Sequence, residues 1–253
     1  MYKRQERPAA FFIGALNQVI LLPVMAYLVV LAFGLTGELA VGLMILAACP
    51  GGVTSNLIAR LARADVALSL SLTAVISLLG VMTIPVILSF SMAQFMGQDA
   101  PDVSILETAL KTFAITVVPV LLGILLRARL SAAEPVMGKV AVGLFVLIVV
   151  AAVAGNWGLF QTHLTALAPA LLTLLALLTL MGFVLPRLMG RTQREAKTIS
   201  VETGLQNSAL GITLAAGLSG GDTISAYALP AAVYGPLMYL IIIPVLLLYR
   251  RMD

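Results

Sequence analysis

The chain has 253 residues, of which 61% are hydrophobic and only 10% are charged. Soluble domains carry roughly 25% charged residues, so this composition excludes a soluble globular domain and predicts an all-α polytopic membrane protein. The formal net charge of +4 does not indicate nucleic-acid binding, because the basic residues are distributed as membrane topology requires.

Eight apolar runs are long enough to cross a membrane, which takes about 20 residues in a helix. They predict spans at about 9–33, 38–63, 66–95, 102–126, 135–154, 164–189, 196–219 and 222–249. Pro50, Gly51 and Gly52 interrupt the second run, and the seventh is interrupted near 204–207. Broken helices at membrane depth are tolerated only inside protein or beside a cavity, so both breaks are candidate binding regions.

The basic residues fall on alternate connections between these spans. One side of the membrane receives Lys3, Arg4, Arg7, Arg60, Arg63, Arg127, Arg129, Lys139, Arg187, Arg191, Arg194, Lys197, Arg250 and Arg251. The opposite connections hold Glu38, Asp99, Asp102, His163 and Asp222, with only Lys111 nearby. By the positive-inside rule, this bias predicts that both termini are cytoplasmic.

The first three spans resemble the last three. Each set has a long span with a Leu-Pro step, a broken span, an acidic turn at Asp65 or Asp222, and a span containing Ile-Pro-Val. We expect the two aspartates to be helix N-caps. The sets start on opposite sides of the membrane, so we expect an inverted repeat, as in many secondary transporters. Spans four and five have no counterpart, and we therefore expect that a pair of helices before residue 1 is missing.

Polar side chains are concentrated at the two breaks and on the spans beside them. They are Asn17, Gln18, Thr54, Ser55, Asn56, Ser69, Thr73, Glu202, Thr203, Gln206 and Asn207. A carboxylate at membrane depth costs roughly 3 kcal/mol, so Glu202 should have a partner, and a cation is a suitable one. Oxygen donors suit hard ions, and one carboxylate is too little charge for a divalent cage. Sodium is the expected ion, with proton coupling through Glu202 as the alternative.

Three segments together resemble the bile acid:sodium symporter family. They are CPGGVTSN at 49–56, ARADVALSLSLTAV at 62–75 and VETGLQNSALG at 201–211. The resemblance implies a single transmembrane domain over 1–253. Within it, core helices at about 9–95 and 164–249 would contain two crossing broken helices, and panel helices would lie at about 102–154. Against ten-helix members, the eight spans correspond to helices three to ten.

The resemblance also implies two sodium sites. The first would use Ser55, Asn56, Ser69, Thr73 and Glu202. The second would use Gln18, Glu202, Thr203, Leu205 and Gln206. An organic anion would be attracted to the crossing point, at Pro50, Gly51, Gly52, Thr54 and Asn207, where helix N-termini add donors. No organic cofactor and no nucleic acid is implied.

We therefore expect a sodium-coupled symporter that imports an organic anion, such as a bile acid-like or small carboxylic acid, by alternating access. Its expected place is the lipid bilayer of a bacterial inner membrane, and its oligomeric state is left open. One alternative is a proton-coupled efflux carrier, for example for arsenite, that depends on Cys49. Another is a non-transporting remnant. An intramembrane hydrolase is not expected, because Ser55 has no histidine or lysine on a neighbouring span to activate it.

Overall fold

The computed structural model describes residues 8–99, 104–127, 157–218 and 225–252, with isolated positions between 128 and 156. Its elements are helices α1 (Pro8–Leu16), η1 (Asn17–Leu21), α2 (Leu22–Ala32), α3 (Gly37–Ala48), α4 (Val53–Leu61), α5 (Val66–Phe95), η2 (Gly97–Asp99), α6 (Ile105–Arg127), α8 (Trp157–Leu188), α9 (Gln193–Gly204), α10 (Ser208–Leu218), η4 (Ala226–Ala228) and α11 (Leu229–Arg251). The fifth predicted span at 135–154 lies outside the described residues, apart from those isolated positions. Asp102 and Asp222 also lie outside them.

The described helices match an all-α polytopic membrane protein. Four of them are long and apolar enough to cross a membrane, at Pro8–Ala32, Val66–Phe95, Phe160–Leu188 and Ala226–Arg251. The half-helices α3 and α10 are apolar but shorter. Asp65 accepts hydrogen bonds from the backbone N–H groups of Ala67 and Leu68, so its predicted role as the N-cap of α5 is confirmed.

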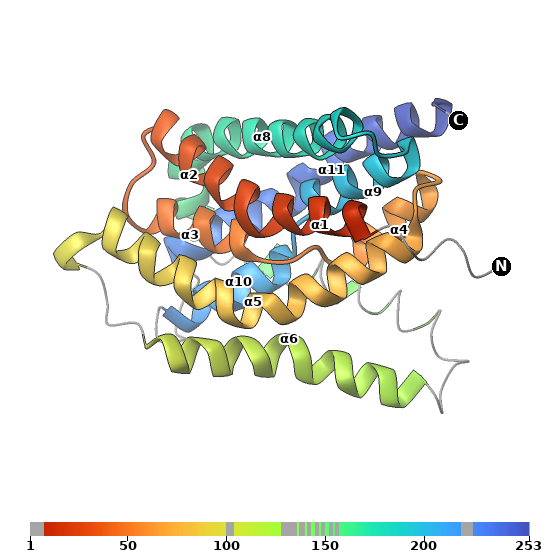
Figure 1. Cartoon of the computed structure of the whole chain (residues 1–253). Coiled ribbons are helices and arrows are strands. Elements are labelled where there is room, and N and C mark those ends of the chain that lie inside the picture. Colours follow the sequence, from red (N-terminus) through yellow and green to blue (C-terminus); the bar gives the residue numbers. More distant parts are fainter. Residues whose placement is uncertain are drawn as a thin grey trace.

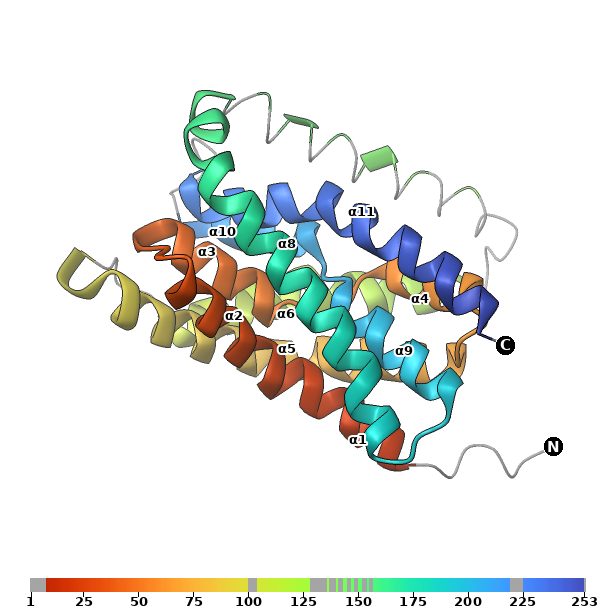
Figure 2. The ribbon, with the colours of Figure 1, turned by 90° about the horizontal axis from the view of Figure 1, so that it is seen from above.

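Two broken helices cross in the middle of the molecule, as predicted. The helix pair α3 and α4 is interrupted between Ala48 and Val53, and the pair α9 and α10 is interrupted between Gly204 and Ser208. The two breaks form an antiparallel bridge between Gly51 and Gln206, and the Asn207 N–H donates to the Pro50 carbonyl at 3.0 Å. As a result, α3 and α10 occupy one half of the molecule, while α4 and α9 occupy the other (Figures 1 and 2).

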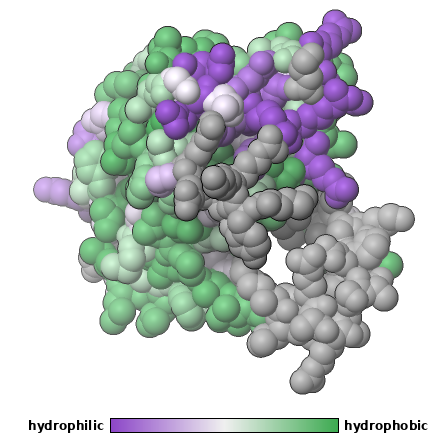
Figure 3. Space-filling view, turned by 45° about the vertical axis from the view of Figure 1, so that its right-hand side comes forward, coloured by the Kyte–Doolittle hydropathy of each residue, from purple (hydrophilic) through white to green (hydrophobic). Residues whose placement is uncertain are grey.

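The arginines gather at one end of the molecule. The end of α4, the turn between α8 and α9 and the C-terminus of α11 lie together on the right of Figure 1. These segments carry Arg60, Arg63, Arg187, Arg191, Arg194, Arg250 and Arg251. Figure 3 shows hydrophilic residues at this end of the visible face and apolar residues over most of the other coloured surface. The clustering fits the alternation of basic connections that the sequence predicted.

Two helix starts differ from the sequence-based bounds. The helix α9 begins at Gln193 rather than near 196, because Thr192 and Glu195 form a capping box. Lys197, expected in a connection, therefore lies inside α9 and is buried. The helix α8 begins at Trp157 rather than near 164, so His163 is a half-buried helical residue rather than a loop residue. Trp157 stacks on Phe160 in this first turn.

Candidate functional site

Glu202 lies in the last turn of α9 and is fully buried. Its carboxylate accepts hydrogen bonds from two hydroxyls of α5, those of Ser69 and Thr73, the latter at 2.9 Å. Ser69 and Thr73 are four residues apart and therefore share one face of α5, as predicted. The sequence predicted that Glu202 has a partner. Two hydroxyls of α5, which is distant from Glu202 in the sequence, are among its partners.

Asn56 of α4 completes this group. The Ser69 hydroxyl lies 2.9 Å from the Asn56 Oδ1 atom, and the Asn56 amide donates to the Thr73 hydroxyl at 3.5 Å. The Ser69 hydroxyl has one proton, yet it faces two acceptors, the Asn56 carbonyl and the Glu202 carboxylate. With the Asn56 amide in this orientation, one of these two oxygens lacks that proton and could accept a cation instead.

The first break approaches the carboxylate closely. A Cβ atom on Gly51 would lie 2.7 Å from the Glu202 Oε2 atom and 3.2 Å from the Ser55 hydroxyl oxygen. Only glycine leaves room for this approach. The Ser55 hydroxyl donates to the Gly52 carbonyl at 2.7 Å and also lies near the Glu202 carboxylate. The structure thus brings together all five residues of the first predicted set, Ser55, Asn56, Ser69, Thr73 and Glu202.

The residues of the second predicted set lie on η1, at the end of α9 and in the break after it. Gln18 lies near Glu202 but makes no hydrogen bond of good geometry. Its amide nitrogen and its amide oxygen are both buried, and neither has a hydrogen-bond partner. The Gln206 amide donates to the Thr203 carbonyl at 2.8 Å, whereas the Gln206 Oε1 atom is buried without a donor. Unpaired buried polar atoms are rare and costly, so a water molecule or an ion would be needed to satisfy these two amide oxygens. The Leu205 carbonyl lies beside Gly51, at 3.5 Å from the position that its Cβ would take.

The crossing residues pair with one another through the backbone. Pro50 has no N–H of its own, and its carbonyl accepts from Asn207. The Asn207 side chain accepts from the Leu210 N–H at 3.0 Å and so caps α10. Thr54 is half-buried in the first turn of α4. The half-helices α4 and α10 both begin at the crossing, which places two helix N-termini there.

Two structural features that support the candidate site could not be predicted from the sequence. Residues Asn17–Leu21 form a π-helical turn, which carries Gln18 on an otherwise α-helical span. Such turns often occur at functional sites, and no sequence signal distinguished this one. Tyr234 of α11 donates to the Gly204 carbonyl at 2.7 Å, at the end of α9. A tyrosine within an apolar span gave no indication of that role.

The donors at the crossing suit a hard monovalent ion. They are hydroxyl, amide and carbonyl oxygens around one carboxylate, and no group of three His, Cys, Asp or Glu residues occurs within the described ranges. Cys49 is buried, donates to the Ile45 carbonyl at 3.2 Å and packs with Ala48, Ile84 and Leu210. Its thiol is therefore used in helix packing.

Comparison with protein families identifies the chain. A profile described as the sodium bile acid symporter family matches residues 2–163. The chain belongs to the sodium bile acid symporter family. The resemblance drawn from the two breaks and from 62–75 is thereby confirmed, and the family is one of transporters rather than of enzymes, as expected.

Named members of this symporter family align with most of the chain. The probable sodium/metabolite cotransporter BASS1 of Arabidopsis thaliana is 31% identical over 82% of this chain and 52% of its own length. The uncharacterized sodium-dependent transporter YocS of Bacillus subtilis is 29% identical, covering 83% of this chain and 65% of its own. The ileal sodium/bile acid cotransporter of Oryctolagus cuniculus is 30% identical over 83% of this chain and 61% of its own. The chain thus spans between half and two thirds of these relatives.

Proposed function

We propose that this chain works as a sodium-coupled symporter that imports an organic anion by alternating access. The observation that carries the proposal is the buried Glu202 carboxylate at the crossing of two broken helices, surrounded by oxygen donors from η1, α4, α5 and α9. The names of the relatives, which include sodium/metabolite and sodium/bile acid cotransporters, support sodium as the coupling ion.

Two sodium ions would share the Glu202 carboxylate. Ser55, Asn56, Ser69 and Thr73 would complete the first site, and Gln18, Gln206 and the carbonyls of Thr203 and Leu205 would complete the second. The unpaired Gln18 and Gln206 oxygens support the second site, because an ion there would satisfy both. Sodium would thereby tie the two broken helices to η1 and α5.

The organic anion would bind next to the ions. Two sodium ions against one carboxylate leave a surplus positive charge, and the N-termini of α4 and α10 add backbone donors at the same place. Pro50, Gly51, Gly52, Thr54 and Asn207 would form this part of the site. A bile acid-like or small carboxylic acid carries the matching charge.

Transport would expose the crossing alternately to the two sides of a bacterial inner membrane. We assign core helices to about 9–95 and 164–249 and panel helices to about 102–154, which would rock against one another. The arginine-rich end formed by α4, α9 and α11 supports a cytoplasmic position for that end and for both termini.

Sodium-dependent stability tests the proposal without a known substrate. The melting temperature of the purified protein would be measured across a sodium titration, with potassium as the ionic-strength control. A ligand that binds only the folded state stabilises it by about 2.7 kcal/mol at a hundred times its Kd. We expect a sodium-specific rise in the wild type that disappears in Glu202→Gln.

Glu107→Gln is the matched control, because it makes the same chemical change at an exposed carboxylate of α6 that pairs with Lys111. This variant should keep the sodium response of the wild type. The proposal fails if sodium and potassium act alike on the wild type, or if Glu202→Gln responds to sodium as the wild type does.

A further inference from the structure

Thr198 lies one turn before Glu202 on α9 and is fully buried. Its hydroxyl oxygen accepts from the backbone N–H of Asp65, the N-cap residue of α5, at 2.8 Å. The same hydroxyl can donate to the Asp65 carbonyl at 3.1 Å or to the Arg194 carbonyl of its own helix at 3.0 Å. One side chain of α9 therefore contacts both backbone polar groups at the start of α5, although 133 positions separate the two residues.

This contact is in line with the first candidate sodium site. Residues four apart share one face of a helix, so Asp65, Ser69 and Thr73 share a face of α5. Thr198 and Glu202 share a face of α9 for the same reason. Both helices begin at the arginine-rich end (Figure 1). The contact of Thr198 with α5 therefore comes one turn before the contacts of Glu202 with α5, and a displacement of α5 along α9 would break both sets together.

The chain before Asp65 forms a tight turn between α4 and α5. Arg63 has a left-handed backbone, with a φ of 55°, which is uncommon for a residue other than glycine. The Ala64 N–H donates to the Ala59 carbonyl at 2.9 Å, which closes the end of α4. The Asp65 side chain in turn caps α5. Because this turn is capped on both sides, a contact at Asp65 positions α4 and α5 as one unit against α9.

This α4–α5 unit carries four of the five residues in the first predicted set. Ser55 and Asn56 come from α4, and Ser69 and Thr73 come from α5, whereas Glu202 comes from α9. The site is therefore assembled only when the α4–α5 unit lies at the right position along α9.

We propose that Thr198 is a positioning residue for the first candidate sodium site. Its hydroxyl fixes the α4–α5 unit along α9, so that the hydroxyls of α5 reach the Glu202 carboxylate. Thr198 itself contacts no ion. The inference rests on the proposed function and adds the contact on which the assembly of the first site depends.

The test is the apparent sodium affinity of the purified chain, measured from its melting temperature across a sodium titration with potassium as the ionic-strength control. Thr198→Val replaces the hydroxyl with a methyl group of similar size and leaves the Asp65 N–H without this partner. We expect Thr198→Val to bind sodium about tenfold more weakly than the wild type. Thr198→Ser, which keeps the hydroxyl, should bind sodium within about threefold of the wild type.

Thr112→Val is the matched control. Thr112 of α6 is also fully buried, and its hydroxyl donates to the Thr108 carbonyl of the same helix at 2.8 Å. The same change of side chain therefore removes a buried hydroxyl without removing a contact to α9. The sodium affinity of Thr112→Val should stay within about threefold of the wild type, even if its melting temperature in potassium falls.

A double-mutant cycle separates positioning from a general loss of stability. Ser69→Ala should weaken sodium binding less in Thr198→Val than in the wild type, because α5 has already moved away from Glu202. In the Thr112→Val background, Ser69→Ala should have its full effect.

Two results would overturn the positioning role while the transporter proposal stands. One is a sodium affinity of Thr198→Val equal to that of Thr112→Val, and the other is an additive cycle with Ser69→Ala. If Thr198→Val does not fold, Thr198→Cys takes its place, because a thiol is a weak acceptor, and an unchanged sodium affinity in Thr198→Cys would likewise overturn the role. A wild type without a sodium-specific response would overturn the proposed function and the positioning role together.

Discussion

The Glu202 carboxylate depends on the chain that passes beside it. Gly51 lies so close that a Cβ atom there would come within 2.7 Å of the Glu202 Oε2 atom. Gly52, the next residue, would meet nothing nearer than the Thr54 hydroxyl at 3.7 Å. Its φ of −98° is open to any residue. Of these two adjacent glycines, only Gly51 is required by the close approach to the Glu202 carboxylate.

This difference predicts unequal effects of alanine. Gly51→Ala should displace the carboxylate and weaken sodium-dependent stabilisation by about tenfold in apparent affinity, in addition to an overpacking cost of about 1–3 kcal/mol. Gly52→Ala should keep a sodium affinity close to that of the wild type. The melting temperature across a sodium titration measures both. Equal sodium responses in the two variants would show that the close approach of Gly51 is not required.

Much of the site could be predicted from single residues, because burying a carboxylate in the membrane costs free energy. Glu202 therefore stands out among the apolar residues around it. Ser69 and Thr73 were predictable from their spacing, which places them on one helix face. That Ser69 faces both Asn56 and Glu202 could not be predicted, since it depends on how α4, α5 and α9 pack. The closeness of Gly51 depends on the same packing.

The helix α9 is held from several sides, and this fixes the end that carries Glu202. Every residue from Glu195 to Gly204 is buried. The Ser200 hydroxyl donates to the Thr179 carbonyl of α8 at 2.6 Å and accepts from Tyr249 of α11 at 2.7 Å. Tyr234 of α11 donates to the Gly204 carbonyl at 2.7 Å. Two tyrosines on one helix thus contact α9, one at its broken end and one earlier.

These tyrosines form a matched pair for mutation. Tyr234→Phe should destabilise the protein by about 1 kcal/mol and also weaken sodium-dependent stabilisation, because it frees the carbonyl next to Leu205 and Gln206. Tyr249→Phe should cost a similar amount of stability but keep the sodium affinity, since its hydroxyl bonds Ser200 instead. Thermal unfolding with and without sodium measures both effects. If Tyr249→Phe lost sodium affinity and Tyr234→Phe kept it, the contact of Tyr234 with the end of α9 would not be what supports the sodium site.

At the scale of elements, the breaks and the start of α5 at Asp65 were predictable, whereas the starts of α8 and α9 were not. Pro50, Gly51 and Gly52 interrupt an apolar run by their backbone chemistry alone. By contrast, α9 begins with the capping box of Thr192 and Glu195. This stretch is polar, so its hydropathy predicts a connection rather than a helix. The π-helical turn at Asn17–Leu21 consists of residues that also fit an α-helix, so only packing reveals it.

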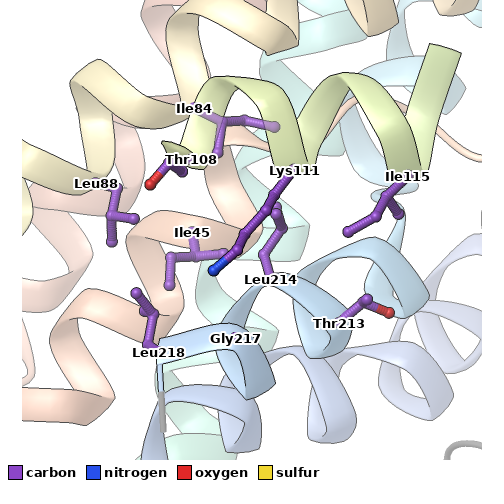
Figure 4. A pocket seen from close by; sticks show the side chains of 10 residues that line it. All are labelled: Ile45, Ile84, Leu88, Thr108, Lys111, Ile115, Thr213, Leu214, Gly217 and Leu218. Carbon is purple, nitrogen blue, oxygen red and sulfur yellow. The ribbon is translucent and has the colours of Figure 1, made fainter. Parts of the chain in front are cut away.

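The whole molecule is organised by the crossing and by the separation of charge. Antiparallel broken helices place α3 and α10 in one half and α4 and α9 in the other (Figure 1). The arginines of the described connections lie in the second half. Their position follows from the order of the spans, so the alternation of charge along the sequence predicted it. A pocket lined by Ile45, Lys111 and Leu218, among others, lies in the first half (Figure 4). The pocket itself depends on side chains from four helices and had no sequence signal.

This arrangement predicts which loops face each side of the membrane. With Cys49→Ser as the background, cysteine variants Gln98→Cys and Met189→Cys would probe the connections after α5 and after α8, where both residues are exposed. An impermeant maleimide added to intact cells should label Gln98→Cys and leave Met189→Cys unlabelled. Both should react once the cells are permeabilised. The positive-inside rule gives this result, because Arg191 lies in the connection after α8 and Arg194 in the first turn of α9, whereas Gln98 lies beside acidic residues. The reverse labelling would contradict this topology and place the arginine-rich end outside the cytoplasm.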